Sequence, residues 1–97
     1  MTIPNYWMKA LGRQAPTTID STSGGVGVTA PSGASYAEFL VETAQIRFTV
    51  DGTAPTTTVG RIANPGDTIK LATTDFTKFK AIRTGSTSGS LQGDYWG

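Results

Sequence analysis

The residues of this 97-residue chain that could carry out acid–base chemistry are its carboxylates, because the sequence contains neither histidine nor cysteine. This composition excludes a thiol nucleophile, a histidine general base and any metal site built from histidine and cysteine. A glycosidase would instead require two carboxylates that face each other across a cleft. The acidic residues available are Asp20, Glu38, Glu42, Asp51, Asp67, Asp75 and Asp94.

The positions of these carboxylates favour structural roles. Glu38 and Glu42 share one face of a predicted strand, where a solvated edge explains them better than a catalytic pair does. Asp51, Asp67 and Asp75 precede or lie in predicted turns, in which a carboxylate accepts hydrogen bonds from nearby backbone N–H groups. Their loops lack the D-x-D-x-D-G spacing of a calcium loop. We therefore expect no enzyme: no catalytic residues, no cofactor and no metal ligands.

Charge and hydropathy argue against two classes of partner. Eight basic and seven acidic residues leave a net charge of +1, which provides neither a basic patch for nucleic acid nor a polybasic run for a membrane surface. The glycine-rich segments STSGGVG and GSTSGS lack the lysine of a phosphate-binding loop. The longest apolar runs are far shorter than a membrane span. We expect a protein partner, and the lack of cysteine is compatible with synthesis in a cytoplasm.

The composition changes near residue 33, and this change predicts two parts. Residues 14–35 read QAPTTIDSTSGGVGVTAPSGAS, which offers little apolar surface to offset the entropy of ordering. We therefore expect residues 1–33 to form an extended arm and residues 34–97 to form the folded domain. Ahead of the polar stretch lies an apolar cluster that would either anchor the arm on a partner or fold back onto the domain's own core. Its residues, of which 6–11 suit one or two helical turns, are Ile3, Tyr6, Trp7, Met8 and Leu11.

From residue 35 onward, apolar and polar residues alternate with the period of strands that are covered on one face. In YAEFLVET, the residues Ala37, Phe39 and Val41 fall on one side, and AQIRFTV repeats the pattern after a kink, bulge or bend. Further strands are predicted in TTTVGRI, TIKLA, KFKAIRT and LQGDYW, with turns at DGTAP and ANPGD, where Pro65-Gly66 suits a type II turn. The pattern predicts an all-β fold, a small antiparallel β-sandwich or jelly-roll-like barrel with an extended N-terminal arm.

Two large aromatic residues, Tyr95 and Trp96, lie near the C-terminus, where they would either pack at the rim of the barrel or be buried in an interface. A chain of this size buries only about 60–65% of the surface that it exposes when unfolded, and no disulfide supports it, so we expect oligomerisation or docking on a larger assembly. The predicted partner-binding anchors are Ile3, Tyr6, Trp7, Met8, Leu11, Tyr95 and Trp96.

The segments AQIRFTVDGTAPTTTVG, IANPGDTIKL and FKAIRTGSTSGSLQGDYW resemble a family of small tailed-phage virion proteins. The resemblance covers residues 36–97 and is most specific at Arg47-Phe48, Asp51-Gly52-Thr53 and Pro55-Thr56. It implies a virion structural protein. The preferred interpretation is a capsid decoration (cement) protein on the capsid exterior, which binds over junctions of the major capsid protein and stabilises the head as a homo-oligomer, often a trimer. A tail or connector component is the alternative within the same resemblance.

The segment FTVDGTAPTT also resembles the YTTDGSxPT signature of immunoglobulin-like modules attached to chitin- and hexosamine-degrading enzymes. Under this second resemblance, the chain would be a carbohydrate-associated or host-adsorption module. Sugar-binding faces display exposed, coplanar tryptophan or tyrosine rings, so the placement of the aromatic residues discriminates between the two interpretations.

Overall fold

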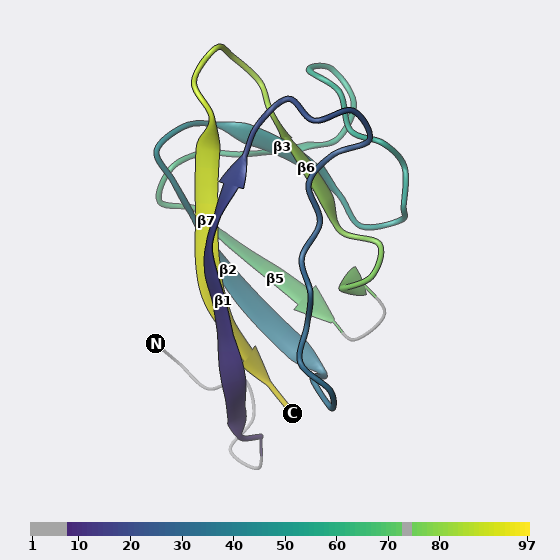
Figure 1. Ribbon diagram of the computed structural model, residues 1–97, viewed down its shortest axis with the longest axis vertical. Helices are drawn as coiled ribbons and strands as arrows, with labels where there is room; N and C mark the ends of the chain where they lie inside the picture. The colour runs from purple at the N-terminus through teal and green to yellow at the C-terminus, as the bar shows by residue number, and fades with distance from the viewer. Residues whose placement is uncertain (1–7, 73–74) are drawn as a thin grey trace.

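The alternating segments after residue 35 form strands that share one core, and an additional strand precedes them (Figure 1). A computed structural model of the chain describes residues 8–72 and 75–97. The strands in this part of the chain are β1 (Ala10–Ile19), β2 (Tyr36–Glu42), β3 (Ile46–Thr49), β4 (Arg61–Ala63), β5 (Thr68–Ala72), β6 (Lys80–Arg83) and β7 (Gly89–Trp96).

The strands form two antiparallel sheets, so the predicted all-β fold and the antiparallel β-sandwich are confirmed. The four-stranded sheet has the order β1-β7-β2-β5, and the three-stranded sheet has the order β4-β3-β6. The core lies between the two sheets, as expected when each sheet has one apolar face. Its most deeply buried large side chains come from both sheets and from the segment before β6, and they are Tyr95, Phe39, Phe79, Ile19, Ile46, Leu71, Leu91 and Val41.

The predicted inward faces of β2 and β3 are confirmed. Ala37, Phe39 and Val41 are buried, and so are Ile46 and Phe48. Phe39 lies at the centre of the aromatic contacts, because its ring packs edge-on against the rings of Phe79 and Tyr95, with centroids 5.9 and 5.6 Å apart. The alternation of apolar and polar residues therefore correctly predicts which side chains of β2 and β3 are buried.

The kink that we expected between the two alternating segments carries the chain from one sheet to the other. β2 belongs to the four-stranded sheet and β3 to the three-stranded sheet. Between them, Ala44 N–H donates to Glu42 O at 2.9 Å, and Thr43 adopts a φ of 76°, a left-handed conformation that is uncommon outside glycine. A tight corner thus separates two strands that a sequence pattern alone could join into one bent strand.

The predicted type II turn at Pro65-Gly66 is confirmed. Asp67 N–H donates to Asn64 O at 2.9 Å, and Gly66 has the positive φ of 95° that the third position of this turn requires. The side chain of Asp67 also accepts a hydrogen bond from Asn64 N–H at 2.7 Å. Asp67 therefore has the capping role that the sequence predicts for it.

The motif that carries both resemblances has a structural role. Arg47 in β3 donates from Nε to Thr57 O at 3.0 Å and from Nη1 to Gly60 O at 2.7 Å. Asp51 accepts a hydrogen bond from Thr53 N–H at 3.0 Å, and this bond holds the pKa of Asp51 below its usual value. These contacts hold the loop between β3 and β4 in place, so a structural role accounts for Arg47 and Asp51 of the motif.

The segment TTTVGRI, predicted as a strand, is a strand only in its last part. Thr56 Oγ1 accepts hydrogen bonds from the backbone N–H groups of Thr58 and Val59 at 3.2 and 3.0 Å. These local bonds turn the chain back on itself, and β4 begins only at Arg61. Threonine stabilises such turns through its hydroxyl group, which competes with strand formation.

The predicted boundary between an arm and a domain at residues 33 and 34 is wrong for the described part of the chain. β1 (Ala10–Ile19) pairs with β7 along its length (Figure 1). Ile19 at its end is fully buried. Val26 forms an isolated bridge with Ala81 and packs partly against the core. Backbone hydrogen bonds to a distant strand order this segment without many apolar side chains, so its composition is misleading. The helical turns expected around Leu11 are replaced by β1, and residues 1–7 lie outside the described residues.

Candidate functional site

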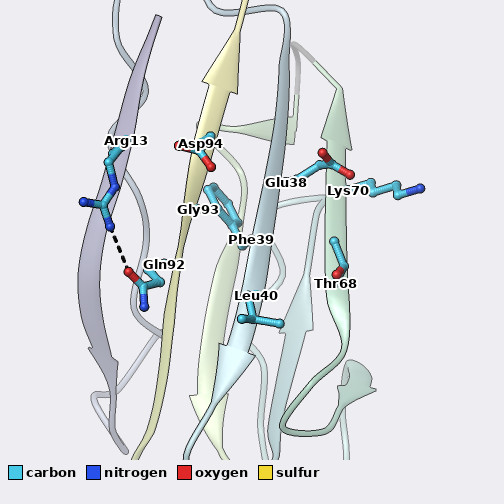
Figure 2. A pocket seen from close by; sticks show the side chains of 9 residues that line it. All are labelled: Arg13, Glu38, Phe39, Leu40, Thr68, Lys70, Gln92, Gly93 and Asp94. Carbon is cyan, nitrogen blue, oxygen red and sulfur yellow. Dashed lines mark hydrogen bonds between the residues drawn. The ribbon is translucent and has the colours of Figure 1, made fainter. Parts of the chain in front are cut away.

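The outer face of the four-stranded sheet carries a broad concave surface (Figure 2). This surface, called the outer groove below, has a volume of about 520 Å³. Residues of all four strands line it, so the sheet rather than a loop forms this surface. The lining residues are Arg13, Glu38, Phe39, Leu40, Thr68, Lys70, Gln92, Gly93 and Asp94.

A row of four charged residues crosses the outer groove. The strand register places Arg13 of β1 opposite Asp94 of β7, Asp94 opposite Glu38 of β2, and Glu38 opposite Lys70 of β5. The order of charges is therefore positive, negative, negative and positive. Like charges directly opposite each other on neighbouring strands disfavour pairing, so the two central carboxylates are not explained by the stability of the sheet.

A chain of hydrogen bonds fixes one side of the outer groove. Arg13 Nη2 donates to Gln92 Oε1 at 2.9 Å, which Figure 2 draws as a dashed line. Gln92 Nε2 in turn donates to Glu42 Oε1 at 2.9 Å. The side chain of Arg13 is thereby directed toward Gln92. Gln92 lies opposite Leu40, two residues along β7 from Asp94 of the charged row. The polar wall of the groove is ordered before any partner arrives, which lowers the entropy cost of binding.

Glu38 differs from Asp94 in having a buried carboxylate oxygen, Oε2, without a hydrogen-bond partner among the described residues. The neighbouring Tyr36 is half-buried, and its pKa is raised above the usual value, first by burial and second by the negative charge of Glu38. Glu38 and Asp94 thus give the centre of the groove a negative character within a neutral overall lining.

Gly93 allows β7 and β2 to approach closely beneath the groove. A Cβ atom at this position would lie 1.9 Å from the carbonyl oxygen of Glu38 and 2.8 Å from the Cα atom of Phe39. No side chain can occupy that space without displacing a strand. Gly93 is a residue whose importance the sequence analysis missed, and its place inside the alternating segment LQGDYW is the signal that marks it.

The carboxylate pair of the groove differs from the pair that the sequence suggested. Glu38 and Glu42 do lie on one face of β2, but the strand register places Asp94 rather than Glu42 beside Glu38. This juxtaposition joins residues that are far apart in sequence, so no local spacing reveals it. Among residues 8–72 and 75–97, no group of three or more potential ligands lies close enough to hold a metal ion.

The predicted anchor role of Tyr95 and Trp96 is wrong, because both side chains are buried in the fold itself, with 0% and 3% of their surfaces exposed. Tyr95 packs in the core, and Trp96 packs against Tyr36 with ring centroids 5.9 Å apart. The remaining described anchors are exposed Leu11 and half-buried Met8, whose predicted role stays a prediction. The anchors Ile3, Tyr6 and Trp7 lie outside the described residues.

Tyr95 makes the stability of the protein sensitive to alkaline pH. Its hydroxyl group donates to Gln14 Oε1 at 2.6 Å, and burial raises its pKa from the usual 10.0 to about 12. The folded state therefore prefers neutral tyrosine, and this contribution is complete below pH 10.0 and is lost as the pH rises toward about 12.

We expect Tyr95→Phe to lose less stability than the wild type between about pH 8 and about pH 11. The midpoint of urea unfolding at the two pH values measures the effect. Tyr36→Phe is the comparison: the pKa of Tyr36 is also raised, but Tyr36 is less buried than Tyr95, so this substitution should reduce the alkaline loss by less than Tyr95→Phe does. An identical alkaline loss in Tyr95→Phe and the wild type would contradict this assignment.

Comparisons of the chain with protein families, curated proteins and solved structures find no match. In the described part of the chain, no helix has the length and apolar character needed to span a membrane.

Proposed function

We propose that the protein is a tailed-phage virion structural protein that decorates the capsid exterior and stabilises the head. The outer groove is its docking surface for the major capsid protein. Two features support this proposal: the resemblance of residues 36–97 to small virion proteins, and a preordered polar face spanning four strands. The protein acts by binding, with no catalytic step, no cofactor and no nucleic-acid partner.

The observation that carries the proposal is the open outer face of the four-stranded sheet. Leu40 lies between the polar residues of this face, and 41% of its surface is exposed. An exposed aliphatic side chain surrounded by hydrogen-bonding and charged groups is the usual composition of a protein interface, with an apolar centre and a polar rim. A partner that covers Leu40 would also engage the charged row on both sides.

Stabilisation of a shell follows from mass action. If the protein binds the assembled shell more tightly than it binds free capsid subunits, each bound copy shifts the assembly equilibrium toward the shell. A homo-oligomer, with a trimer preferred, would present several copies of the outer groove and gain further affinity by multivalent contact. The copies are made in the host cytoplasm and reside on the virion.

Location on a tail or connector is the second candidate, and it would use the same docking face. The carbohydrate module is less well supported, because the described aromatic side chains are buried, apart from half-buried Tyr36. A sugar-binding platform needs exposed rings. Binding of the monomer to a glycan array would favour this third candidate over the first two.

The test uses head shells from a phage that normally encodes this protein and from which the coding sequence has been deleted. These shells therefore lack the protein. Purified protein at about 10 µM should co-sediment with the shells. Leu40→Glu should weaken binding by at least about tenfold, because it places a charge at the centre of the interface.

The matched control for this test is Ile62→Glu. Ile62 is exposed to a similar extent, 49%, but lies in β4 of the other sheet, so its substitution should leave shell binding unchanged. Failure of the wild-type protein to bind the shells, together with its absence from purified virions by mass spectrometry, would overturn the proposed function. Equal binding by the two variants would reject the outer groove as the docking surface.

A further inference from the structure

The outer edge of β5 has backbone groups that no strand of the described residues pairs with. Val41 N–H donates to Asp67 O at 2.9 Å, which fixes the alternation of hydrogen bonds between β2 and β5. Phe39 and Ile69 then form a bonded pair, and the backbone groups of Thr68 and Lys70 point away from β2. Ala72 N–H also points outward, as its hydrogen bond to Asp75 Oδ2 at 3.3 Å confirms.

A second hollow adjoins this edge. Its volume is about 280 Å³, and it lies where β5 of one sheet approaches the β3 and β4 residues of the other. Residues 68–71 line one side, and Phe48, Val50, Arg61 and Asp75 line the remainder. A strand added beside β5 would direct every second side chain into this hollow and the others onto the outer face.

The two edges of the four-stranded sheet are protected to different degrees. β1, at the opposite edge, contains Pro16 and two irregularities in its register with β7, features that hinder pairing with another strand. β5 has neither a proline nor a register irregularity with β2. Of these two edges, β5 is therefore the one open to an added strand.

Charge decides which kind of strand suits β5. Lys70 is exposed at the centre of β5, and Arg61 lies on the rim of the adjoining hollow. Two copies of β5 paired antiparallel about Lys70 would bring two lysines opposite each other, which is unfavourable. An acidic residue opposite Lys70 would instead continue the charged row of the outer groove with a favourable pair.

We propose that the β5 edge binds an extended segment of a partner protein by strand addition, with an acidic residue opposite Lys70 and every second side chain directed into the hollow. Main-chain hydrogen bonds to Thr68 and Lys70 provide affinity, and the alternate side chains provide specificity. This inference goes beyond the proposed function and does not depend on it. The outer groove and the β5 edge are neighbouring surfaces that share Thr68 and Lys70.

The test uses blocked peptides of alternating glutamate and valine, or of alternating lysine and valine, with the intact isotope-labelled protein. The glutamate peptide should slow amide hydrogen exchange at Thr68 and Lys70 by about tenfold or more in NMR measurements. The amides of Ile69 and Leu71, which already bond to β2, should change little. The same peptide with methylated backbone nitrogens should have no effect.

Lys70→Glu should weaken binding of the glutamate peptide by about tenfold and create binding of the lysine peptide. Lys9→Glu is the matched control: it makes the same change in net charge next to β1 and should preserve the wild-type preference. Absence of protection at Thr68 and Lys70 would overturn the proposal, as would equal binding of both peptides. Concentration-dependent protection without peptide would also overturn it, because a second copy would then be the occupant.

Discussion

Gly93→Ala is expected to destabilise the protein by about 3 kcal/mol or more, a large share of the stability of a domain of this size. The added Cβ atom would lie 1.9 Å from the carbonyl oxygen of Glu38, and backbone cannot move aside as the end of a side chain can. Relief requires β7 to move away from β2, which breaks the central pairing of the four-stranded sheet. Urea unfolding followed by tryptophan fluorescence measures the loss.

Gly85→Ala is the matched control for this substitution. A Cβ atom at Gly85 would meet no atom within 4 Å, and its φ lies outside the left-handed region. The change should alter the free energy of unfolding by less than about 0.5 kcal/mol. If Gly93→Ala were as stable as Gly85→Ala, the close packing of β7 against β2 would be wrong, and with it the shape of the outer groove.

Phe39→Ala is expected to cost about 3–5 kcal/mol, because it removes a fully buried ring from the centre of the sandwich. The ring of Phe39 contacts Phe79 and Tyr95 edge-on, so the substitution leaves a cavity and removes two aromatic contacts. The loss of stability has two parts: the favourable free energy of burying the ring is lost, and the cavity that remains adds a further cost. Urea unfolding at neutral pH gives the difference directly.

Two variants keep this prediction testable if Phe39→Ala does not fold. Phe39→Leu retains an apolar side chain at the same position and should be intermediate in stability between the wild type and Phe39→Ala. Ile62→Ala removes an exposed aliphatic side chain from β4 and should cost less than about 1 kcal/mol. Equal losses for Phe39→Leu and Ile62→Ala would contradict the position of Phe39 in the core.

The strands that bury alternate side chains were predictable from the sequence, and so was the turn at Pro65-Gly66. For β2, the buried set Ala37, Phe39 and Val41 follows from alternation alone, because successive side chains of a strand point to opposite faces. The type II turn follows from the fixed φ of proline and the conformational freedom of glycine. Both are local properties that neighbouring residues determine.

The candidate site was not predictable in the same way. Glu38 was recognised as one carboxylate of a possible pair, but Asp94, Arg13 and Lys70 join it only through the pairing of four strands. The prediction for Tyr95 and Trp96 also failed for this reason, since an aromatic residue near a terminus can face either a partner or the core. Only the pairing of β7 with β1 and β2 decides between these two outcomes.

Local alternation and turn chemistry in the sequence therefore determine that this protein is an antiparallel β-sandwich and which side chains of β2 and β3 fill its core. The tertiary structure alone decides that Ala10–Ile19 is a strand of the domain rather than an arm, because its order comes from backbone hydrogen bonds to β7, about eighty positions further along the chain. The same long-range pairing builds the outer groove and leaves the edge of β5 open. Amino-acid composition cannot predict such a surface, because its residues come together only when strands that are distant in sequence pair.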